Sequence, residues 1–151
     1  MNNWFQVKAT YEKKLENGMQ KKVTESFLLD SLSFTEAETR AVEELRPYIN
    51  GEFVIADIKR AKLSELFFND NGDRFFKAKV CFITIDEKSG TEKKTVVQML
   101  AQASSLREAL QVVYKGMEGT LADYFIASLS ETSIMDVFPY SEDEKKKVIL
   151  V

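Results

Sequence analysis

Residues 18–38 read GMQKKVTESFLLDSLSFTEAE, and residues 90–110 read GTEKKTVVQMLAQASSLREAL. At an offset of 72 positions (90 minus 18), Lys21 coincides with Lys93, Leu28 with Leu100 and Ser33 with Ser105. At an offset of 71, WFQVKATY (4–11) lies on FFKAKVCF (75–82), and VIADIKRAKLSELF (54–67) lies on FIASLSETSIMDVF (125–138). Two unrelated strand–helix segments can resemble each other, but matches in the same order over a whole unit indicate a tandem duplication.

Each copy predicts the same elements in the same order. The segments WFQVKATY and RFFKAKVCF alternate with a period of two, which is typical of strands, and the turns ENG and KSG connect them to second strands. The pairs Ser33/Glu36 and Ser105/Glu108 then fit capping boxes, which begin helices. A third strand follows in each copy, so the repeated unit is ββαβ.

These elements predict an α+β fold, a tandem duplication of a ββαβ unit with a mostly antiparallel sheet and two helices on one face. The two copies are expected to pair edge to edge, which protects strand edges. The predicted organisation is one compact pseudo-symmetric domain. Its parts are a first repeat at 1–68, a linker at 69–74, a second repeat at 75–140 and a charged C-terminal tail at 141–151.

Helical periodicity predicts which side of each helix is buried. The predicted core face of the first helix consists of Phe34, Ala37, Ala41, Leu45 and Ile49, and that of the second consists of Leu106, Ala109, Leu110, Val113 and Met117.

Strand alternation divides each predicted sheet into an apolar face and a mixed face. The apolar face holds Phe5, Val7, Ala9 and Tyr11 in the first copy and Phe76, Ala78, Val80 and Phe82 in the second. The opposite, helix-free face holds Trp4 and Lys8 in the first copy and Phe75, Lys77 and Lys79 in the second. This face is too apolar to be ordinary solvent surface. Either the tails LSELFF and IMDVFPY or a second chain covers it, or it binds single-stranded nucleic acid, with rings stacking on bases and lysines contacting phosphates.

Two lysine pairs follow the hairpin turns at equivalent places. Lys21 and Lys22 follow the first turn, and Lys93 and Lys94 follow the second. Such basic tips are candidates for gripping a nucleic-acid backbone at two points. The alternative is that the charges only keep the hairpins soluble.

Composition excludes several kinds of chemistry. The chain of 151 residues has a net charge of −3, one cysteine and no histidine. Histidine-based triads, histidine-liganded metals and a structural zinc site are therefore ruled out, and no glycine-rich phosphate loop is present. We expect neither enzymatic activity nor a cofactor. The N-terminus does not resemble a signal peptide and no apolar run would span a bilayer, so we expect a cytoplasmic protein without membrane contact.

The phrases WFQVKATYEKKLENGMQKKVTESFLLDSLSFTEAE, IADIKRAKLSELF, EKSGTEKKTVVQML and ETSIMDVFPY carry a family resemblance. The chain from about Trp4 to Tyr140 resembles a domain of unknown function found in Bacteroides-type gut bacteria and their phages and mobile elements. The resemblance implies a small intracellular protein of phage or mobile-element origin that binds nucleic acid or host proteins. It supplies no catalytic or binding residues.

The sequence thus predicts a non-enzymatic binding protein, with single-stranded nucleic acid narrowly favoured as ligand. The alternative is a protein-interaction module or phage-encoded inhibitor of a host protein, which acts as a homodimer or through another partner. Candidate ligand-binding residues are Trp4, Lys8, Phe75, Lys77, Lys79, Lys21, Lys22, Lys93 and Lys94.

Overall fold

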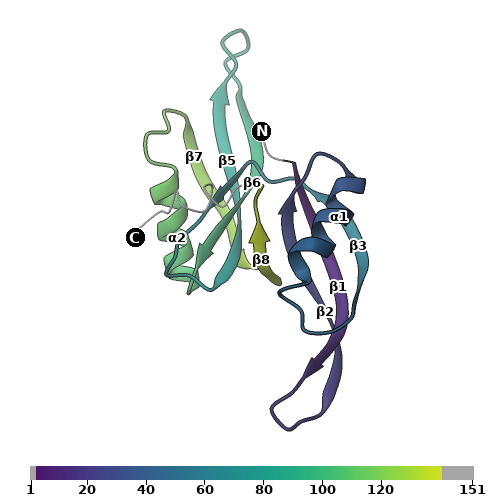
Figure 1. Ribbon diagram of the computed structural model, residues 1–151. Helices are drawn as coiled ribbons and strands as arrows, with labels where there is room; N and C mark the ends of the chain where they lie inside the picture. The colour runs from purple at the N-terminus through teal and green to yellow at the C-terminus, as the bar shows by residue number, and fades with distance from the viewer. Residues whose placement is uncertain (1–2, 141–151) are drawn as a thin grey trace. The chain divides into compact units, whose positions relative to one another are not determined.

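The computed structural model describes residues 3–140, which form an α+β fold of eight strands and two helices (Figure 1). The predicted tail at 141–151 lies outside the described residues. The elements of the first half are β1 (Trp4–Lys14), β2 (Gln20–Asp30), α1 (Phe34–Leu45), β3 (Phe53–Ala61) and β4 (Glu65–Phe67). Those of the second half are β5 (Arg74–Ile85), β6 (Glu92–Ala103), α2 (Leu106–Gly116), β7 (Asp123–Glu131) and β8 (Ile134–Phe138). Each half therefore has the ββαβ order that the duplication predicts, followed by one short extra strand.

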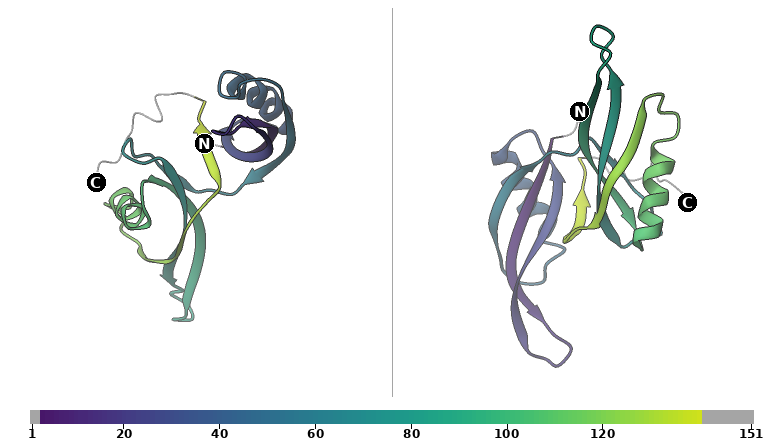
Figure 2. Two further views of the ribbon diagram at one scale, coloured as in Figure 1. Left: turned by 90° about the horizontal axis from the view of Figure 1, so that it is seen from below. Right: turned by 180° about the vertical axis from the view of Figure 1, so that it is seen from behind.

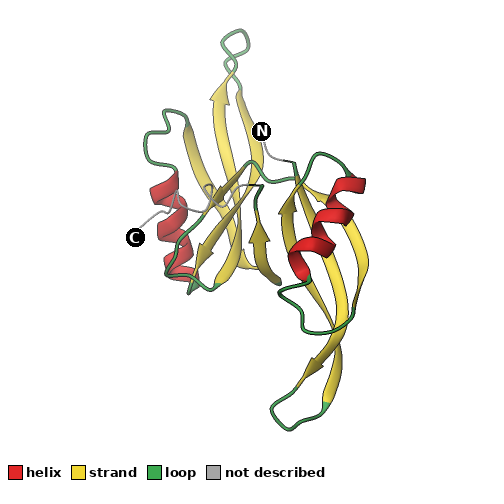
Figure 3. Ribbon diagram, in the orientation of Figure 1, coloured by secondary structure: helices red, strands yellow, loops and turns green. Residues whose placement is uncertain are grey.

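The strands form two separate four-stranded sheets, with the orders β3-β1-β2-β8 and β4-β6-β5-β7. The expected edge-to-edge pairing of the copies in one continuous sheet is not observed. Both sheets are mostly antiparallel, and each has its own helix on one face (Figure 3). When the second order is reversed to β7-β5-β6-β4, each strand takes the same place as its counterpart in β3-β1-β2-β8. This equivalence is expected for a duplicated unit.

The two sheets exchange their last strands. β8, from the end of the chain, pairs in parallel with β2, whereas β4, from the first half, pairs in parallel with β6. The described chain accordingly divides into unit 1, residues 3–61 with 133–140, and unit 2, residues 62–132. These units differ from the predicted repeats at 1–68 and 75–140 by one strand each. The tails LSELFF and IMDVFPY thus become edge strands of the other unit, and they do not cover the sheet face of their own copy.

Chain geometry explains why a strand leaves its own copy. β3 lies at one edge of its sheet, and the vacant position beside β2 lies three strands away, roughly 14 Å across the sheet. Residues 62–64 connect β3 to β4, and a crossover to a parallel position normally takes a dozen or more residues. Because the connection is too short to pass over β1 and β2, β4 completes the other sheet.

The predicted capping boxes are confirmed in both helices. The Ser33 hydroxyl accepts a hydrogen bond from the Glu36 amide at 3.2 Å, and the Ser105 hydroxyl accepts one from the Glu108 amide at 3.1 Å. The Glu108 carboxylate also accepts a bond from the Ser104 amide at 2.9 Å. Each helix start is therefore encoded locally and identically in the two copies.

The predicted core faces of the strands are confirmed. In unit 1 the helix-facing side chains of β1 pack with those of α1, and in unit 2 the same positions of β5 pack with α2. The helix faces are only partly as predicted, because Phe34, Leu106 and Leu110 are 49%, 53% and 37% exposed. Val112, which was not assigned to the core, is fully buried. The buried side of α2 therefore centres on Ala109, Val112 and Val113.

Each exchanged strand is anchored by polar contacts in the unit that receives it. In unit 1, Arg40 of α1 donates to the carbonyl oxygens of Asp30 and, at 3.2 Å, Pro139, and its guanidinium lies 4.7 Å from the centre of the Tyr140 ring. Next to these contacts, Phe138 stacks on Phe27. The end of β8 is therefore held to both α1 and β2.

In unit 2 a buried amide performs the equivalent task. Asn69, which follows β4, is fully buried; its side-chain amide donates to the Glu108 carboxylate at 3.1 Å, and its backbone amide donates to Gln102 at 3.0 Å. Gln102 in turn donates to the Gly72 carbonyl oxygen at 3.0 Å. These bonds fix the segment 69–74 in place, so this turn-forming joint is part of the packed structure.

Candidate binding surfaces

The aromatic residues predicted to bind nucleic acid are buried. Trp4 is 5% exposed and Phe75 is 4% exposed, so neither ring is presented for base stacking. The prediction that these two rings form an accessible stacking surface is therefore wrong in this structure. Strand alternation assigns a side chain to one face of a sheet but does not say what covers that face.

The predicted lysines of the sheet face belong to different units. Lys8 belongs to unit 1 and stands opposite Ser26 and Asp57, whereas Lys77 and Lys79 belong to unit 2. Lys8 and Lys77 are half-buried, and Lys79 is exposed. None of the three adjoins an accessible ring of the predicted surface, so their role in binding stays a prediction.

The basic tips occupy equivalent hairpins but have different surroundings. In unit 1, Lys21 stands directly opposite Lys13, and Lys22 stands opposite Glu12. In unit 2, Lys93 stands opposite Thr84 and Lys94 opposite Ile83. The Lys94 ammonium also lies 6.0 Å from the centre of the Phe125 ring. All four predicted tip lysines are exposed. Of the two hairpins, the one in unit 1 has a cross-strand pair of lysines and the one in unit 2 has none.

A surface that the sequence reasoning missed runs along α2. Leu106, Leu110 and Tyr114 follow one another at four-residue spacing and are 53%, 37% and 50% exposed. We refer to these three residues as the α2 stripe. Their spacing is a signal in the sequence, but it is also the spacing of a core face, to which Leu106 and Leu110 were assigned.

The equivalent helix positions in unit 1 indicate which strand lies beside the α2 stripe. Phe34, Glu38 and Val42 of α1 line two shallow depressions, of about 450 and 700 Å³, whose other wall is β3. The two helices begin at matching capped serines, so the α2 stripe occupies the matching side, beside β7. β7 is an edge strand of its sheet, as β3 is.

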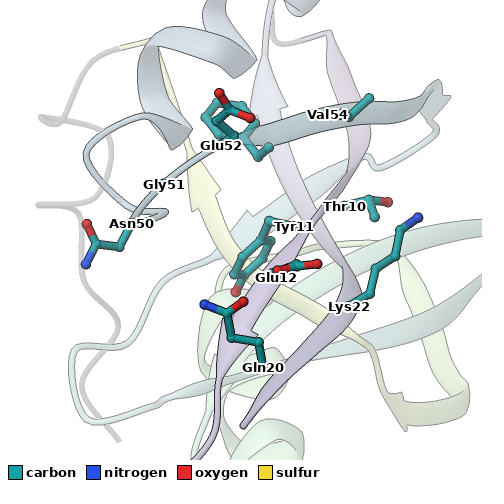
Figure 4. A pocket seen from close by; sticks show the side chains of 10 residues that line it. Thr10, Tyr11, Glu12, Gln20, Lys22, Asn50, Gly51, Glu52 and Val54 are labelled. Carbon is teal, nitrogen blue, oxygen red and sulfur yellow. The ribbon is translucent and has the colours of Figure 1, made fainter. Parts of the chain in front are cut away.

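A depression in unit 1 surrounds Tyr11 (Figure 4). It is open, measures about 790 Å³ and extends from the hairpin of β1 and β2 to the segment before β3. The Tyr11 hydroxyl donates to the Glu25 carboxylate, and Lys13 forms an ion pair with Glu25 at 3.6 Å. In unit 2 the equivalent pair is Phe82 and Val97, so this polar contact is specific to unit 1.

The tyrosines of this region are poor acid–base catalysts. Burial, followed by the hydrogen bond to Glu25, raises the pKa of Tyr11 to about 12. Burial raises the pKa of Tyr48 as well, with smaller contributions from Asp136 and Glu25. Both hydroxyls therefore keep their protons at neutral pH. No group of acidic or thiol side chains within residues 3–140 is suited to hold a metal ion.

Tyr11 predicts a pH dependence of stability. Its pKa is about 12 in the folded chain and near 10.0 without structure, so the folded state holds the proton more tightly. Its contribution is complete below pH 10 and is lost as the pH rises from about 10 to about 12. We expect Tyr11→Phe to cost about 1 kcal/mol at neutral pH and to flatten the fall in unfolding free energy across that window, as measured by urea unfolding.

The control for this experiment is Tyr114→Phe, which removes an exposed hydroxyl from α2. It is expected to leave the alkaline loss of stability unchanged. If Tyr11→Phe and the parent protein lose the same free energy between pH 10 and pH 12, the hydrogen bond to Glu25 does not contribute as described.

The fold and surfaces define a duplicated α+β protein with two strand-exchanged sheets and surface features that differ between its copies. The chain belongs to the family described as Domain of unknown function (DUF4494), whose model matches residues 3–140. No curated protein and no solved structure matches the chain significantly. Neither helix within residues 3–140 is long and apolar enough to cross a membrane.

Proposed function

We propose that this protein is a non-enzymatic binding protein whose ligand is an extended segment of another protein, held by unit 2 between α2 and β7. The observation that carries the proposal is the exposed α2 stripe beside an open sheet edge. An extended segment that pairs with an edge strand gains main-chain hydrogen bonds and places alternate side chains against the neighbouring helix.

Comparison of the two copies supports a role beyond folding for the stripe. Unit 1 has Glu38 where unit 2 has Leu110, and it forms the same helix and sheet. The fold therefore does not require an apolar side chain at this position. Exposed apolar residues in a row on a helix cost solubility, and such rows commonly mark sites of protein association.

The open edge is partly protected, which favours a specific partner over indiscriminate pairing. In β7 the register shifts between Ile126 and Ser128, which leaves Ala127 as an extra residue. β3 has the same bulge at Ala56. Bulges interrupt an edge and discourage unspecific strand addition. The identity of Ala56 and Ala127 in the two repeats fits this shared task.

We favour a protein ligand over single-stranded nucleic acid bound to the helix-free sheet face. The latter depended on Trp4 and Phe75, whose rings are buried. A cytoplasmic protein of phage or mobile-element origin, which the family resemblance implies, is a setting in which a small module would act by binding host proteins. A second copy of the chain remains an alternative occupant that the experiment below distinguishes.

The test uses the whole chain and random dodecapeptides displayed on phage. Selected peptides are synthesised, and their binding is measured by fluorescence anisotropy. We expect apolar residues at alternate positions and at least a tenfold loss of affinity for Leu110→Glu, about 1.4 kcal/mol, because the added charge is desolvated. Gln111→Glu places the same charge on an exposed neighbouring position and is expected to bind as the parent does.

Peptide-induced shifts of amide resonances identify the binding strand. The proposal predicts shifts in β7 and α2, with β3 and α1 unaffected. It fails if no peptide is enriched or if Leu110→Glu binds the selected peptides as tightly as the parent. A peptide-independent dimer that Leu110→Glu dissociates identifies a second copy as the occupant and contradicts the extended-segment proposal.

A further inference from the structure

We infer that the hairpin end of β1 and β2, residues 12–22, is a basic arm that inserts into a groove of duplex DNA. This inference concerns unit 1 and is independent of the peptide site proposed for unit 2. It rests on three features of the arm: its two-stranded form, its charge and its apolar tip.

The arm is a two-stranded ribbon with no third strand beside it. β3 pairs with β1 only as far as Tyr11, whereas β1 and β2 continue to pair out to Lys14 and Gln20. Every residue from 12 to 22 is exposed. The ribbon extends beyond α1 and β3 of its own unit (Figure 1, and Figure 2, right). Proteins place two-stranded ribbons in the major or the minor groove of duplex DNA.

Most of the positive charge of the arm has no partner in the fold: Lys13 pairs with Glu25 at 3.6 Å, but no ion pair within residues 3–140 involves Lys14, Lys21 or Lys22. The arm has Lys13, Lys14, Lys21 and Lys22 against Glu12 and Glu16, a net charge of +2 in a chain whose total is −3. Lys13 and Lys21 face each other directly, an arrangement that destabilises a hairpin. Contact with an anionic ligand would turn this repulsion into an attraction, because phosphates between the lysines would be stabilised by both.

The second hairpin is an internal control for this argument. Its equivalent residues 84–94 have three lysines, Lys88, Lys93 and Lys94, against three acidic residues, so their net charge is zero. No lysine stands opposite another lysine there. The same hairpin thus forms without an excess of positive charge.

The tip of the arm exposes two apolar side chains. Leu15 and Met19 flank the turn, where the Leu15 amide donates to the Met19 carbonyl oxygen at 2.8 Å, and they are 38% and 65% exposed. The equivalent residues of the second hairpin are Glu87 and Thr91. Proteins that bend DNA commonly place leucine or methionine between base steps as a wedge. The arm contains no aromatic residue, so it lacks the stacking surface with which proteins bind single strands.

The test measures binding of the whole chain to a fluorescent duplex of about 20 base pairs by anisotropy, at about 50 and about 200 mM salt. Three to four phosphate contacts predict that affinity falls by about 40- to 150-fold between these conditions. The variant with glutamine at Lys13, Lys14, Lys21 and Lys22 is expected to lose at least tenfold in affinity at the lower salt. The matched control has glutamine at Lys88, Lys93 and Lys94 and should bind within about twofold of the parent.

A second variant separates the tip from the charge. Met19→Ser is expected to weaken binding several-fold and to leave the salt dependence unchanged, because no ionic contact is removed. Circular dichroism tests whether each variant is folded. We expect all of them to fold, because the substituted side chains of the arm are exposed.

The inference is overturned if the parent does not bind the duplex at the lower salt. It is also overturned if the control variant loses as much affinity as the arm variant. Tighter binding to the corresponding single strand, or to vesicles of phosphatidylcholine and phosphatidylglycerol, would contradict insertion into a DNA groove. Loss of peptide binding by Leu110→Glu does not affect any of these outcomes, so the two proposals fail separately.

Discussion

A chain that ends at Thr132 is expected to lose the folded state of unit 1 and to keep that of unit 2. This truncation removes β8, which lies in unit 1 although its sequence belongs to the second repeat. Phe138 belongs to the core of unit 1, where its ring stacks on Phe27, so this contribution is lost with the strand. Arg40 also loses the Pro139 carbonyl oxygen and the Tyr140 ring.

The expected cost is comparable to the whole stability of a small unit. Removal of one large buried side chain costs about 3–5 kcal/mol, and small domains are stable by about 5–15 kcal/mol. Hydrogen exchange followed by mass spectrometry measures where protection is lost. We expect the amides of β1 and β2 to exchange rapidly and those of β5 and β6 to remain protected.

A chain that ends at Tyr140 is the control, because it retains β8 and its anchors. Its amides in β1 and β2 should be as protected as those of the whole protein. If truncation at Thr132 instead removes protection from β5 to β7, each repeat completes its own sheet, and the strand exchange described above is incorrect.

Gly72→Ala is expected to destabilise unit 2 by about 3 kcal/mol or more, because a methyl group at this position has no space. A Cβ atom there would lie 2.4, 2.5 and 2.7 Å from the Cα, N and C atoms of Ala103. These atoms belong to the backbone at the end of β6 and cannot rotate away as a side chain does. The backbone at residue 72 would have to move away from Ala103, and this shift would also break the hydrogen bond from Gln102 to the carbonyl oxygen of residue 72.

Thermal unfolding monitored by circular dichroism measures this effect. We expect a decrease of about 10 °C or more in the melting temperature of unit 2, since 1 kcal/mol corresponds to about 4–8 °C in a domain of this size. Gly90→Ala is the matched control. Gly90 has a φ of +69° with no atom near its missing Cβ, so alanine there costs only the left-handed conformation, about 1–2 kcal/mol. Equal losses for the two variants would show that the backbone at Ala103 yields, contrary to this account.

These two predictions mark the limit of sequence reasoning for this protein. Turn-forming residues identified 69–74 as a joint, but the close approach of Gly72 to Ala103 joins positions thirty-one apart and has no local signature. The burial of Trp4 and Phe75 is a similar case, because alternation assigned them to a face without showing whether solvent reaches it. The α2 stripe was missed for the opposite reason, since helical periodicity does not distinguish an exposed apolar row from a buried one.

The amino-acid sequence by itself determined the duplication, the ββαβ order, the capped helix starts and the core side of each first strand. These features depend on neighbouring residues, whose spacing and hydrogen bonds are local. The tertiary structure alone decided which sheet receives each last strand. Phe67 of β4 stands opposite Ala101, and Phe138 of β8 stands opposite Leu29, at equivalent positions of sheets with equivalent strand orders, so the apolar pattern by itself does not assign either segment to a sheet. The choice was made by the length of the connection after β3, which cannot cross its own sheet.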